Sequence, residues 1–381
     1  MDPELLVISL EQAVAAPLCS RRLADFGARV VKIEPPEGDF ARRYDRVVRG
    51  QSAYFVWLNR GKESISLDLR RRDDLALLEA MVRRADVFIH NLRPGGLADL
   101  GIDLAGWRHA NQRLITCTIS GYGAGGPYAA RKAYDLLVQA ESGLASITGS
   151  AAEPSRVGIS VVDIGAGVTA YEAILEALLR RSRTGTGEHV EVSLFDAISE
   201  WMAVPLLHAL YAQAPRRVGL MHPSIAPYGA FACRDGVRVL LGVQNEREWV
   251  SLCAEVLGKP DLAHDARFRD NTLRVANRGA LDAELARVFA VDPSEEVCRR
   301  LNQANVAYGV INNLAAVLEH PMLRMIEVPT AAGGISVPAP AARHSGARPR
   351  IGPVPERDQQ GAALRAEFAP DAGDAGSSRG R

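Results

Sequence analysis

The sequence places one carboxylate just before a predicted helix that has two glycines near its start. Asp163 comes just before a predicted helix over 164–183, and Gly165 and Gly167 follow it. An aspartate in this place commonly caps a helix by accepting hydrogen bonds from first-turn N–H groups. The glycines weaken such a turn, but they would admit a bulky ligand and expose backbone donors. Two roles stay open: a cap, and a nucleophile that attacks a thioester carbonyl while nearby N–H groups stabilise the oxyanion.

Basic side chains recur in predicted loops near the ends of predicted strands. They are Arg60 and Lys62, Arg93 within 91–95, and the pair Arg131 and Lys132. Each by itself is typical of a solvated surface charge. Because α/β proteins bind ligands at the carboxyl ends of their strands, the set together is suited to hold the phosphates of a nucleotide.

Several familiar catalytic patterns are missing or misplaced. The loop over 9–17, where a dinucleotide-binding fold carries G-x-G-x-x-G, contains no glycine. Gly121, Gly123 and Gly126 fit that spacing, but Pro127 follows them, which favours a glycine-rich active-site loop. No G-x-S-x-G is present, which argues against an ordinary hydrolase. The histidines show no metal-ligand spacing, and only His222 lies in a loop suggestive of a function.

Alternating strands and helices predict the scaffold for these residues. Short apolar runs at 5–9, 30–33, 87–89 and 114–120 read as strands, and the segments 19–26 and 75–84 have helical spacing. This order indicates an α/β fold with a largely parallel, Rossmann-like sheet. The long helix over 164–183 ends at a Thr-Gly-Thr-Gly run and leads into a strand over 189–194.

Composition changes along the chain predict two domains. A large domain over 1–204 gives way to a proline-punctuated linker over 205–227. A smaller α+β domain over 228–318 opens with a hairpin around Asp235 and Gly236. Residues 319–368 are predicted to return to the large domain, and 369–381 to form a disordered tail.

Charge and cysteine content exclude several classes of protein. The 381 residues include 45 basic and 45 acidic side chains, so no basic excess points to nucleic acid or a membrane surface. No apolar run is long enough to cross a bilayer. Five scattered cysteines fit reduced thiols, and the N-terminus does not resemble a signal peptide, so we expect a cytoplasmic protein.

Ordered motifs along almost the whole chain resemble those of the family III CoA-transferases. That family includes formyl-CoA transferase, carnitine CoA-transferase and the α-methylacyl-CoA racemases. The motifs lie at 27–34, 58–62, 91–95, 120–128, Asp163 and 184–197. By this resemblance Asp163 is the aspartate that becomes acylated and then bound to CoA. The family fold also implies a ring-shaped subunit in an interlocked homodimer.

The resemblance assigns further residues to the CoA site. They are Val14, Asn59, Arg60, Lys62, Asn91, Leu92, Arg93, Leu100, Lys132 and Tyr134. Val14 stands where the transferases have a glutamine, with Gln12 nearby. Asp99 and Pro35 replace basic residues that the transferases use near the CoA phosphates, so we expect the anchoring to be partly different.

The racemases share the fold and the CoA site and form the main alternative. Racemisation needs an aspartate and a histidine on opposite faces of the α-carbon. This chain has Ala133, Tyr134 and Asp135 where the racemases have Gly-His-Asp. A tyrosine with a reference pKa of about 10 is a poor proton shuttle at neutral pH, which favours transfer. A catalytically idle CoA-binding homologue is a third possibility.

The loop over 222–228 resembles that of enzymes acting on C4 or C5 dicarboxylates. His222 and Ser224 are therefore candidates to meet a second carboxylate of the substrate. We expect succinyl-CoA as donor and itaconate, mesaconate, citramalate or malate as acceptor. CoA thioesters would be substrates, with no metal or permanently bound cofactor.

Overall fold

The computed structural model describes residues 5–346 and 349–369 and divides the chain into two compact units. The first unit joins the described residues up to Leu144 with Val157–Val204 and with the part from Arg324 onward. The second joins Ala145–Arg156 with Pro205–Leu323. Of the predicted disordered tail, residues 370–381 lie outside the described part.

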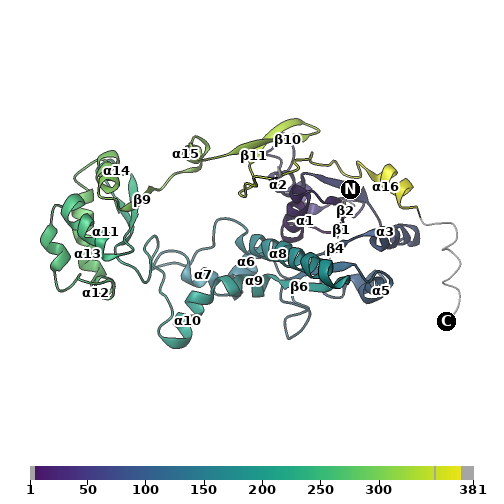
Figure 1. The fold of residues 1–381 in the computed structure, drawn as a ribbon, viewed down its shortest axis with the longest axis horizontal. Helices are drawn as coiled ribbons and strands as arrows, with labels where there is room; N and C mark the ends of the chain where they lie inside the picture. The colour runs from purple at the N-terminus through teal and green to yellow at the C-terminus, as the bar shows by residue number, and fades with distance from the viewer. Residues whose placement is uncertain (1–4, 347–348, 370–381) are drawn as a thin grey trace. The chain divides into compact units, whose positions relative to one another are not determined.

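The first unit contains a six-stranded parallel sheet with the order β3-β2-β1-β4-β5-β6 (Figure 1). Every neighbouring pair of strands runs parallel, which confirms the predicted α/β class. The strands are β1 (Leu6–Leu10), β2 (Arg29–Glu34), β3 (Lys62–Ser66), β4 (Val87–His90), β5 (Ile115–Ser120) and β6 (His189–Ser193).

Helices cover both faces of this sheet, because alternate strand residues point to opposite sides. Val7 packs in one apolar core with α1 and α8, and Ile8 packs in another with α3 and α16. The helices of this unit are α1 (Ala15–Phe26), α2 (Ala53–Asn59), α3 (Arg72–Arg84), α4 (Gly96–Asp99), α5 (Leu104–Ala110), α6 (Asp135–Glu141), α8 (Val161–Thr184), α9 (Leu194–Trp201) and α16 (Gly361–Glu367), with a 3-10 turn at Phe40–Arg43.

The glycines of the first turns of α8 serve close packing. A Cβ on Gly167 would lie 2.6 Å from the backbone oxygen of Ala15, where α8 crosses α1. A Cβ on Gly165 would meet the ring of Trp201 at 3.4 Å, and both glycines are buried. A neighbouring element therefore lies beside each glycine: the Ala15 backbone leaves no room for a Cβ at position 167, whereas a Cβ at position 165 would make an ordinary contact with Trp201.

An antiparallel hairpin, separate from the parallel sheet, lies in the stretch 319–368 that was expected to return to the large domain. It consists of β10 (Met325–Thr330) and β11 (Gly333–Pro338). Val328, Ile335 and Val337 pack against Phe55 and Val56 of α2. The hairpin thus belongs to the core of the first unit.

The second unit contains a three-stranded antiparallel sheet and a bundle of helices. The strands β7 (Tyr228–Ala232) and β8 (Arg238–Gly242) form the predicted hairpin, and β9 (Ala307–Val310) pairs with β8. Its helices are α11 (Glu246–Ser251), α12 (Asn271–Ala276), α13 (Arg278–Phe289), α14 (Ser294–Gln303) and α15 (Leu314–Leu318), with a π turn at Leu252–Val256 and a 3-10 turn at Pro260–His264.

Two helices lie at the junctions between the units. Helix α10 (Ala203–Tyr211) occupies the start of the segment 205–227, which the sequence had suggested was irregular. Helix α7 (Leu144–Ile147) begins the short piece that joins the second unit. Neither was predicted, because prolines and glycines near both segments suggested loops.

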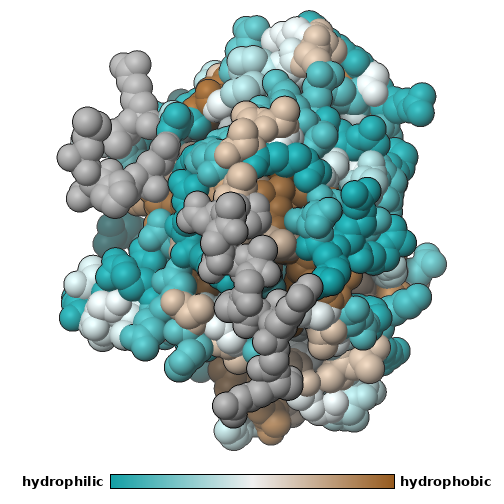
Figure 2. Space-filling model, turned by 90° about the vertical axis from the view of Figure 1, so that its right-hand side faces the viewer, coloured by the Kyte–Doolittle hydropathy of each residue, from teal (hydrophilic) through white to brown (hydrophobic). Residues whose placement is uncertain are grey.

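Neither a membrane-spanning helix nor a metal-binding cluster is found among the described residues. No helix within 5–346 or 349–369 is both long and apolar enough to span a bilayer. The face drawn in Figure 2 is mostly hydrophilic. Within those residues no cluster of three or more His, Cys, Asp or Glu side chains is arranged to hold a metal ion.

Candidate active site

Asp163 lies inside the first turn of α8, not before it. The helix starts at Val161, three residues earlier than the periodicity suggested, and its N-cap residue is Ser160. In the described part of the chain no group donates a hydrogen bond to the Asp163 carboxylate. The alternative role of Asp163 as a helix cap is therefore wrong.

The cap of α8 comes from another helix. Asp135, the first residue of α6, accepts hydrogen bonds through Oδ1 from the N–H groups of Val162 at 2.8 Å and Asp163 at 3.3 Å. The N–H of Ile164 donates to the carbonyl of Ser160 at 2.9 Å. Because these first-turn donors are already used, this turn does not supply the expected donors to an oxyanion.

The surroundings of Asp163 disfavour its charge. Burial raises the pKa of the Asp163 carboxyl to about 7, and the neighbouring carboxylate of Asp135 acts in the same direction. A carboxyl group with this pKa exists in both protonation states near neutral pH. Strong perturbation by burial and a specific charge is typical of functional groups.

Val14 forms the apolar wall beside this helix turn. It is buried at the start of α1 and packs with Leu18 and Leu58. Ile164, the residue after Asp163, contacts the same cluster. The structure therefore brings the predicted pair Val14 and Asp163 into one neighbourhood.

Aromatic side chains near Asp163 were missed from the sequence. The rings of Tyr44 and Tyr54 lie 5.4 Å apart, and those of Tyr54 and Trp57 lie 6.4 Å apart. Burial raises the pKa of Tyr44 to about 12, with smaller contributions from Asp39, Asp163 and Tyr134. No local pattern shows that residues 44–57 return to residue 163, so only the fold reveals this wall.

The loop between β1 and α1 is fixed by side chains from the neighbouring strands. Asn91, just after β4, accepts from the Gln12 N–H at 3.0 Å and donates to the Gln12 carbonyl at 2.8 Å. Ala13 has a φ of 64° and donates its N–H to Asp39 Oδ1 at 3.3 Å. The order of the sheet reverses between β1 and β4, the place where open α/β sheets bind ligands.

Four fully buried charged residues lie next to the loop between β1 and α1. We call them the buried charge cluster. They are Glu11, Lys32, Asp39 and Lys62. Glu11 pairs with Lys62 at 2.6 Å and Lys32 at 3.4 Å, and Lys32 pairs with Asp39 at 2.9 Å. Burial alone would raise the pKa of Glu11, but the two lysines hold it at about 2. Burial lowers the pKa of Lys62 to about 8, against the opposing effect of Glu11.

The predicted CoA contacts over 59–62 point into the domain. Asn59 accepts from Lys62 at 3.0 Å, and Arg60 pairs with Asp25 at 2.7 Å. The side chains of Asn59, Arg60 and Lys62 are all buried. In this structure the charges of Arg60 and Lys62 are paired with acids inside the first unit.

Other predicted CoA residues lie at an open edge of the first unit. Arg93 is exposed and forms an ion pair with Asp99. Leu92 and Leu100 are half-buried against the core that includes α3. Lys132 and Tyr134 are exposed, and among the described residues no acid or carbonyl pairs with the Lys132 ammonium. Lys132 is thus a cation available to a ligand, whereas Asp99 already offsets the charge of Arg93.

His222 and Ser224 lie in a well-held loop of the second unit. The His222 ring stacks on Tyr228 with centroids 5.2 Å apart, and its Nδ1 accepts from the Ser224 N–H at 3.1 Å. Arg278 donates to the carbonyls of His222 at 2.6 Å and Ile225 at 2.7 Å. The predicted substrate loop therefore has a defined conformation of its own.

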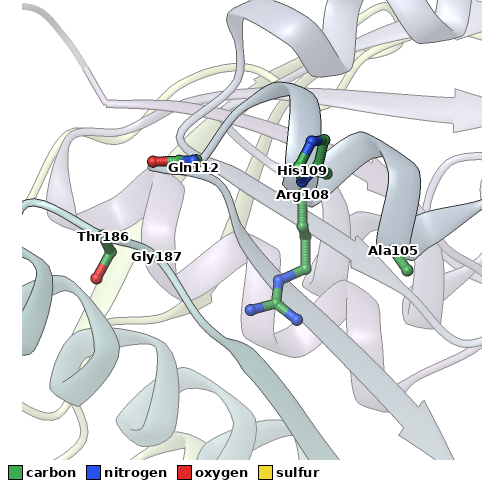
Figure 3. A pocket seen from close by; sticks show the side chains of 6 residues that line it. All are labelled: Ala105, Arg108, His109, Gln112, Thr186 and Gly187. Atoms are coloured by element: carbon green, nitrogen blue, oxygen red, sulfur yellow. The ribbon is translucent and has the colours of Figure 1, made fainter.

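A surface pocket of about 350 Å³ lies elsewhere in the first unit (Figure 3). Helix α5 and the segments just before β5 and β6 line it, through Ala105, Arg108, His109, Gln112, Thr186 and Gly187. These are the amino ends of the strands, whereas Asn91 and the 121–126 loop follow the carboxyl ends. The pocket is therefore separate from the surroundings of Asp163.

The chain is similar to known proteins over most of its length. The family model "CoA-transferase family III" matches residues 4–360. An acetyl-CoA:oxalate CoA-transferase of Acetobacter aceti is 39% identical, covering 96% of this chain and 95% of that protein. A succinyl-CoA:glutarate CoA-transferase of Mus musculus is 34% identical, covering 89% and 79%.

A solved structure of a CAIB/BAIF family protein from Brucella suis has a TM-score of 0.82 at 34% identity, covering 96% of this chain and 98% of that one. A solved protein from Mycobacterium tuberculosis has a TM-score of 0.85 at 28% identity, covering 96% and 99%. These matches confirm the resemblance drawn from the motifs, and the enzyme class expected from it: the chain belongs to CoA-transferase family III.

Proposed function

We propose that this enzyme moves CoA from succinyl-CoA to a dicarboxylic acid through covalent intermediates on Asp163. The observation that carries the proposal is the state of that carboxyl group. It is largely shielded from water, accepts no hydrogen bond within the described residues, and has a pKa raised to about 7. When ionised, such a group is poorly solvated and therefore a strong nucleophile.

In the first half of the reaction, CoA passes from the donor acid to the Asp163 carboxyl group. A carboxylate oxygen of Asp163 attacks the thioester carbonyl, the C–S bond breaks, and CoA leaves as the thiolate. The thiolate then attacks the Asp163 carbonyl of the mixed anhydride, and succinate leaves as a carboxylate. This step yields an aspartyl-CoA thioester at residue 163.

The second half repeats these steps with the acceptor. The acceptor carboxylate attacks the Asp163 carbonyl and displaces CoA thiolate, which forms a second mixed anhydride. The thiolate attacks the acceptor carbonyl of that anhydride, which releases the new acyl-CoA and restores the Asp163 carboxylate. The cycle needs no permanently bound cofactor, because CoA enters and leaves as a substrate.

The choice of a dicarboxylate rests on relatives and on one loop. Relatives are named for oxalate, glutarate, mesaconate and citramalate, and several of those names give succinyl-CoA as the donor. The stacked His222 presents its imidazole on a loop held by Arg278. We propose that His222 and Ser224 bind the second carboxylate of the acceptor.

We propose that the CoA moiety lies at the carboxyl ends of β1 and β4. Val14 and Tyr134 would line the thioester end, and Leu92 and Leu100 would contact the nucleotide. Lys132 would bind a phosphate, as would Arg93 once its pair with Asp99 opens. Gln12 would reach the acceptor from its fixed backbone.

We also propose that the active form is a homodimer. Helix α10 exposes Leu207, Leu210 and Tyr211, and α15 exposes Leu314 and Leu318. Such apolar side chains gathered on helices commonly mark an association surface. Analytical ultracentrifugation tests this directly: a dimer mass supports the proposal, and a monomer mass at assay concentrations contradicts it.

A panel assay tests the proposed reaction. Succinyl-CoA is incubated with oxalate, glutarate, malate, mesaconate, citramalate and itaconate, and new thioesters are separated by chromatography. We expect at least one dicarboxyl-CoA product from the wild type and none from Asp163→Ala. Transfer by Asp163→Ala at the wild-type rate would eliminate the covalent mechanism.

Solvent deuterium distinguishes the racemase alternative. Exchange at the α-carbon of a 2-methylacyl-CoA, without thioester transfer, would mark racemisation. We expect none, because Tyr134 occupies the place where that chemistry requires a histidine.

A further inference from the structure

We propose that Asp135 is a positioning residue, which fixes Asp163 for attack and favours its conversion into a neutral covalent intermediate. This inference rests on the proposed transfer reaction at Asp163. It assigns a role to a residue on a different helix that the sequence analysis did not include among the site residues. The argument starts from the way the first turn of α8 is held.

Asp135 replaces a cap that the chain does not provide locally. The N-cap side chain of α8, Ser160, makes no capping hydrogen bond. Asp135 instead accepts from the Val162 and Asp163 N–H groups, so the backbone of the nucleophile itself is held by this carboxylate. A shift of Asp135 would therefore move Asp163 directly.

Gln139 holds Asp135 in turn. Its Nε2 donates to Asp135 Oδ2 at 2.7 Å, and its Oε1 accepts from the Val157 N–H at 2.9 Å. Gln139 is completely buried. The pair Asp135 and Gln139 thus joins α6 to the segment that leads into α8.

This cap places a second negative charge beside the nucleophile. The described groups that act on Asp163 or are affected by it are Asp135 and the phenol of Tyr44, and no basic side chain pairs with it. An asparagine could accept the same N–H bonds without charge, but its amide NH2 would face the Gln139 Nε2 donor. The carboxylate therefore satisfies Gln139 as well as the helix turn, and its charge has a further effect on Asp163.

That effect follows from the change in charge during the reaction. The free Asp163 carboxylate is repelled by Asp135, whereas Asp163 in an anhydride or a thioester is neutral. Acylation relieves the repulsion, so Asp135 raises the free energy of the ionised resting enzyme relative to the covalent intermediates. Burial and Asp135 together account for the raised pKa of Asp163.

The test compares Asp135→Asn with Ser160→Ala. Asparagine keeps the Oδ1 acceptor but removes the charge, and Ser160→Ala changes the same turn without touching either carboxylate. We measure kcat/KM for succinyl-CoA with the best acceptor between pH 5 and 9. In Asp135→Asn the acidic limb is expected to move down by about one pH unit, the usual size for loss of a nearby like charge; Ser160→Ala should leave it in place.

A second measurement does not depend on catalysis. The melting temperatures of each variant, with and without Asp163→Asn, are compared across the same pH range to follow the ionisation of Asp163. The pH at which the Asp163→Asn gain levels off should fall, and the gain should become smaller, in the Asp135→Asn background. If Asp135→Asn does not fold, Asp135→Ser removes the charge with a smaller acceptor and is measured identically.

The outcomes separate the two proposals. An Asp163 titration that is unchanged by loss of the Asp135 charge overturns the inference, whatever the enzyme catalyses. Wild-type transfer by Asp163→Ala overturns the proposed function, while the thermal titration still reports on Asp135. An Asp135→Asn variant that shifts the titration but accumulates as much covalent intermediate as the wild type overturns the proposed effect on the reaction.

Discussion

Two carboxylates in the first unit, the buried Glu11 and the partly buried Asp163, have opposite surroundings. Glu11 receives hydrogen bonds from Ser9 and Ser20 at 2.5 Å each and pairs with Lys62 and Lys32. The Asp163 carboxylate accepts no hydrogen bond within the described residues and lies near Asp135. The pKa of Glu11 is about 2, whereas that of Asp163 is about 7.

The comparison shows that partners, not burial, decide what a buried carboxylate does. Burial raises both pKa values, and at Glu11 the two lysines, with a smaller contribution from the Ser20 hydrogen bond, reverse that effect. The buried charge cluster supports the β1–α1 loop through Asp39, so its charges contribute to structure. Asp163 carries an unfavourable charge that the fold tolerates because the reaction uses it.

The largest effect is expected when Glu11 loses its charge. Glu11→Gln leaves Lys62 without its ion pair and Lys32 with only one, and we expect a loss of about 3–5 kcal/mol in the free energy of unfolding. Urea denaturation at pH 7 measures it. The double variant Glu11→Leu with Lys62→Met should recover a large part, because it removes both charges of the pair. A loss below about 1 kcal/mol would show that the cluster is not structural.

A change of opposite sign in the free energy of unfolding is expected when Asp163 loses its charge. The pKa of Asp163 is about 7 in the folded state against an ordinary value of 3.8, so the ionised carboxylate lowers the stability of the fold. The cost is absent below pH 4, grows between pH 4 and 7, and is complete above pH 7. Asp163→Asn should therefore stabilise the protein by about 2–4 kcal/mol at pH 8. Thermal melts across this range provide the check, and a variant less stable than the wild type at pH 8 would refute it.

Catalysis should follow the same ionisation. Because only the carboxylate attacks, kcat/KM for succinyl-CoA should rise with pH and level off above about 7. Below that pH it should fall about tenfold per pH unit, the slope of one titrating group. Stopped assays in buffers of constant ionic strength measure the profile. A flat profile between pH 5 and 8 would contradict the raised pKa of Asp163.

The smallest effect is expected at an ion pair that faces water. Arg70 pairs with Asp68 at 2.8 Å, and Arg70 is highly exposed. Solvent screens such a pair, so Arg70→Ala should leave the midpoint of urea unfolding and the transfer rate unchanged. A clear drop in the unfolding midpoint would mean that geometry alone does not separate structural charges from incidental ones.

Local sequence patterns predicted much of the fold and the candidate nucleophile. Strand and helix periodicity indicated the parallel α/β sheet, the long helix α8 and the hairpin at Asp235 and Gly236, because each depends on residues close in sequence. Asp163 was selected from its place before an apolar helix. The family resemblance joined Val14 to it, and the structure packs Val14 beside the same turn.

What could not be predicted depends on contacts between distant residues. The start of α8 at Val161 depends on Asp135, and nothing near residue 161 reveals that partner. Arg60 and Lys62 read as ligand-facing cations, but Asp25 and Glu11 draw them inward. Whether a lysine in a predicted loop faces solvent or a buried acid is decided by the fold, not by its neighbours in sequence.

Trapping the covalent intermediate tests the central claim most directly. The enzyme is incubated with succinyl-CoA, quenched with hydroxylamine, digested and examined by mass spectrometry, with Asp163→Asn as the control. We predict a hydroxamate on the peptide that contains Asp163, dependent on succinyl-CoA and absent from the variant. Turnover without modification of that peptide, or with modification of another carboxylate, would contradict the assignment of Asp163 as the nucleophile.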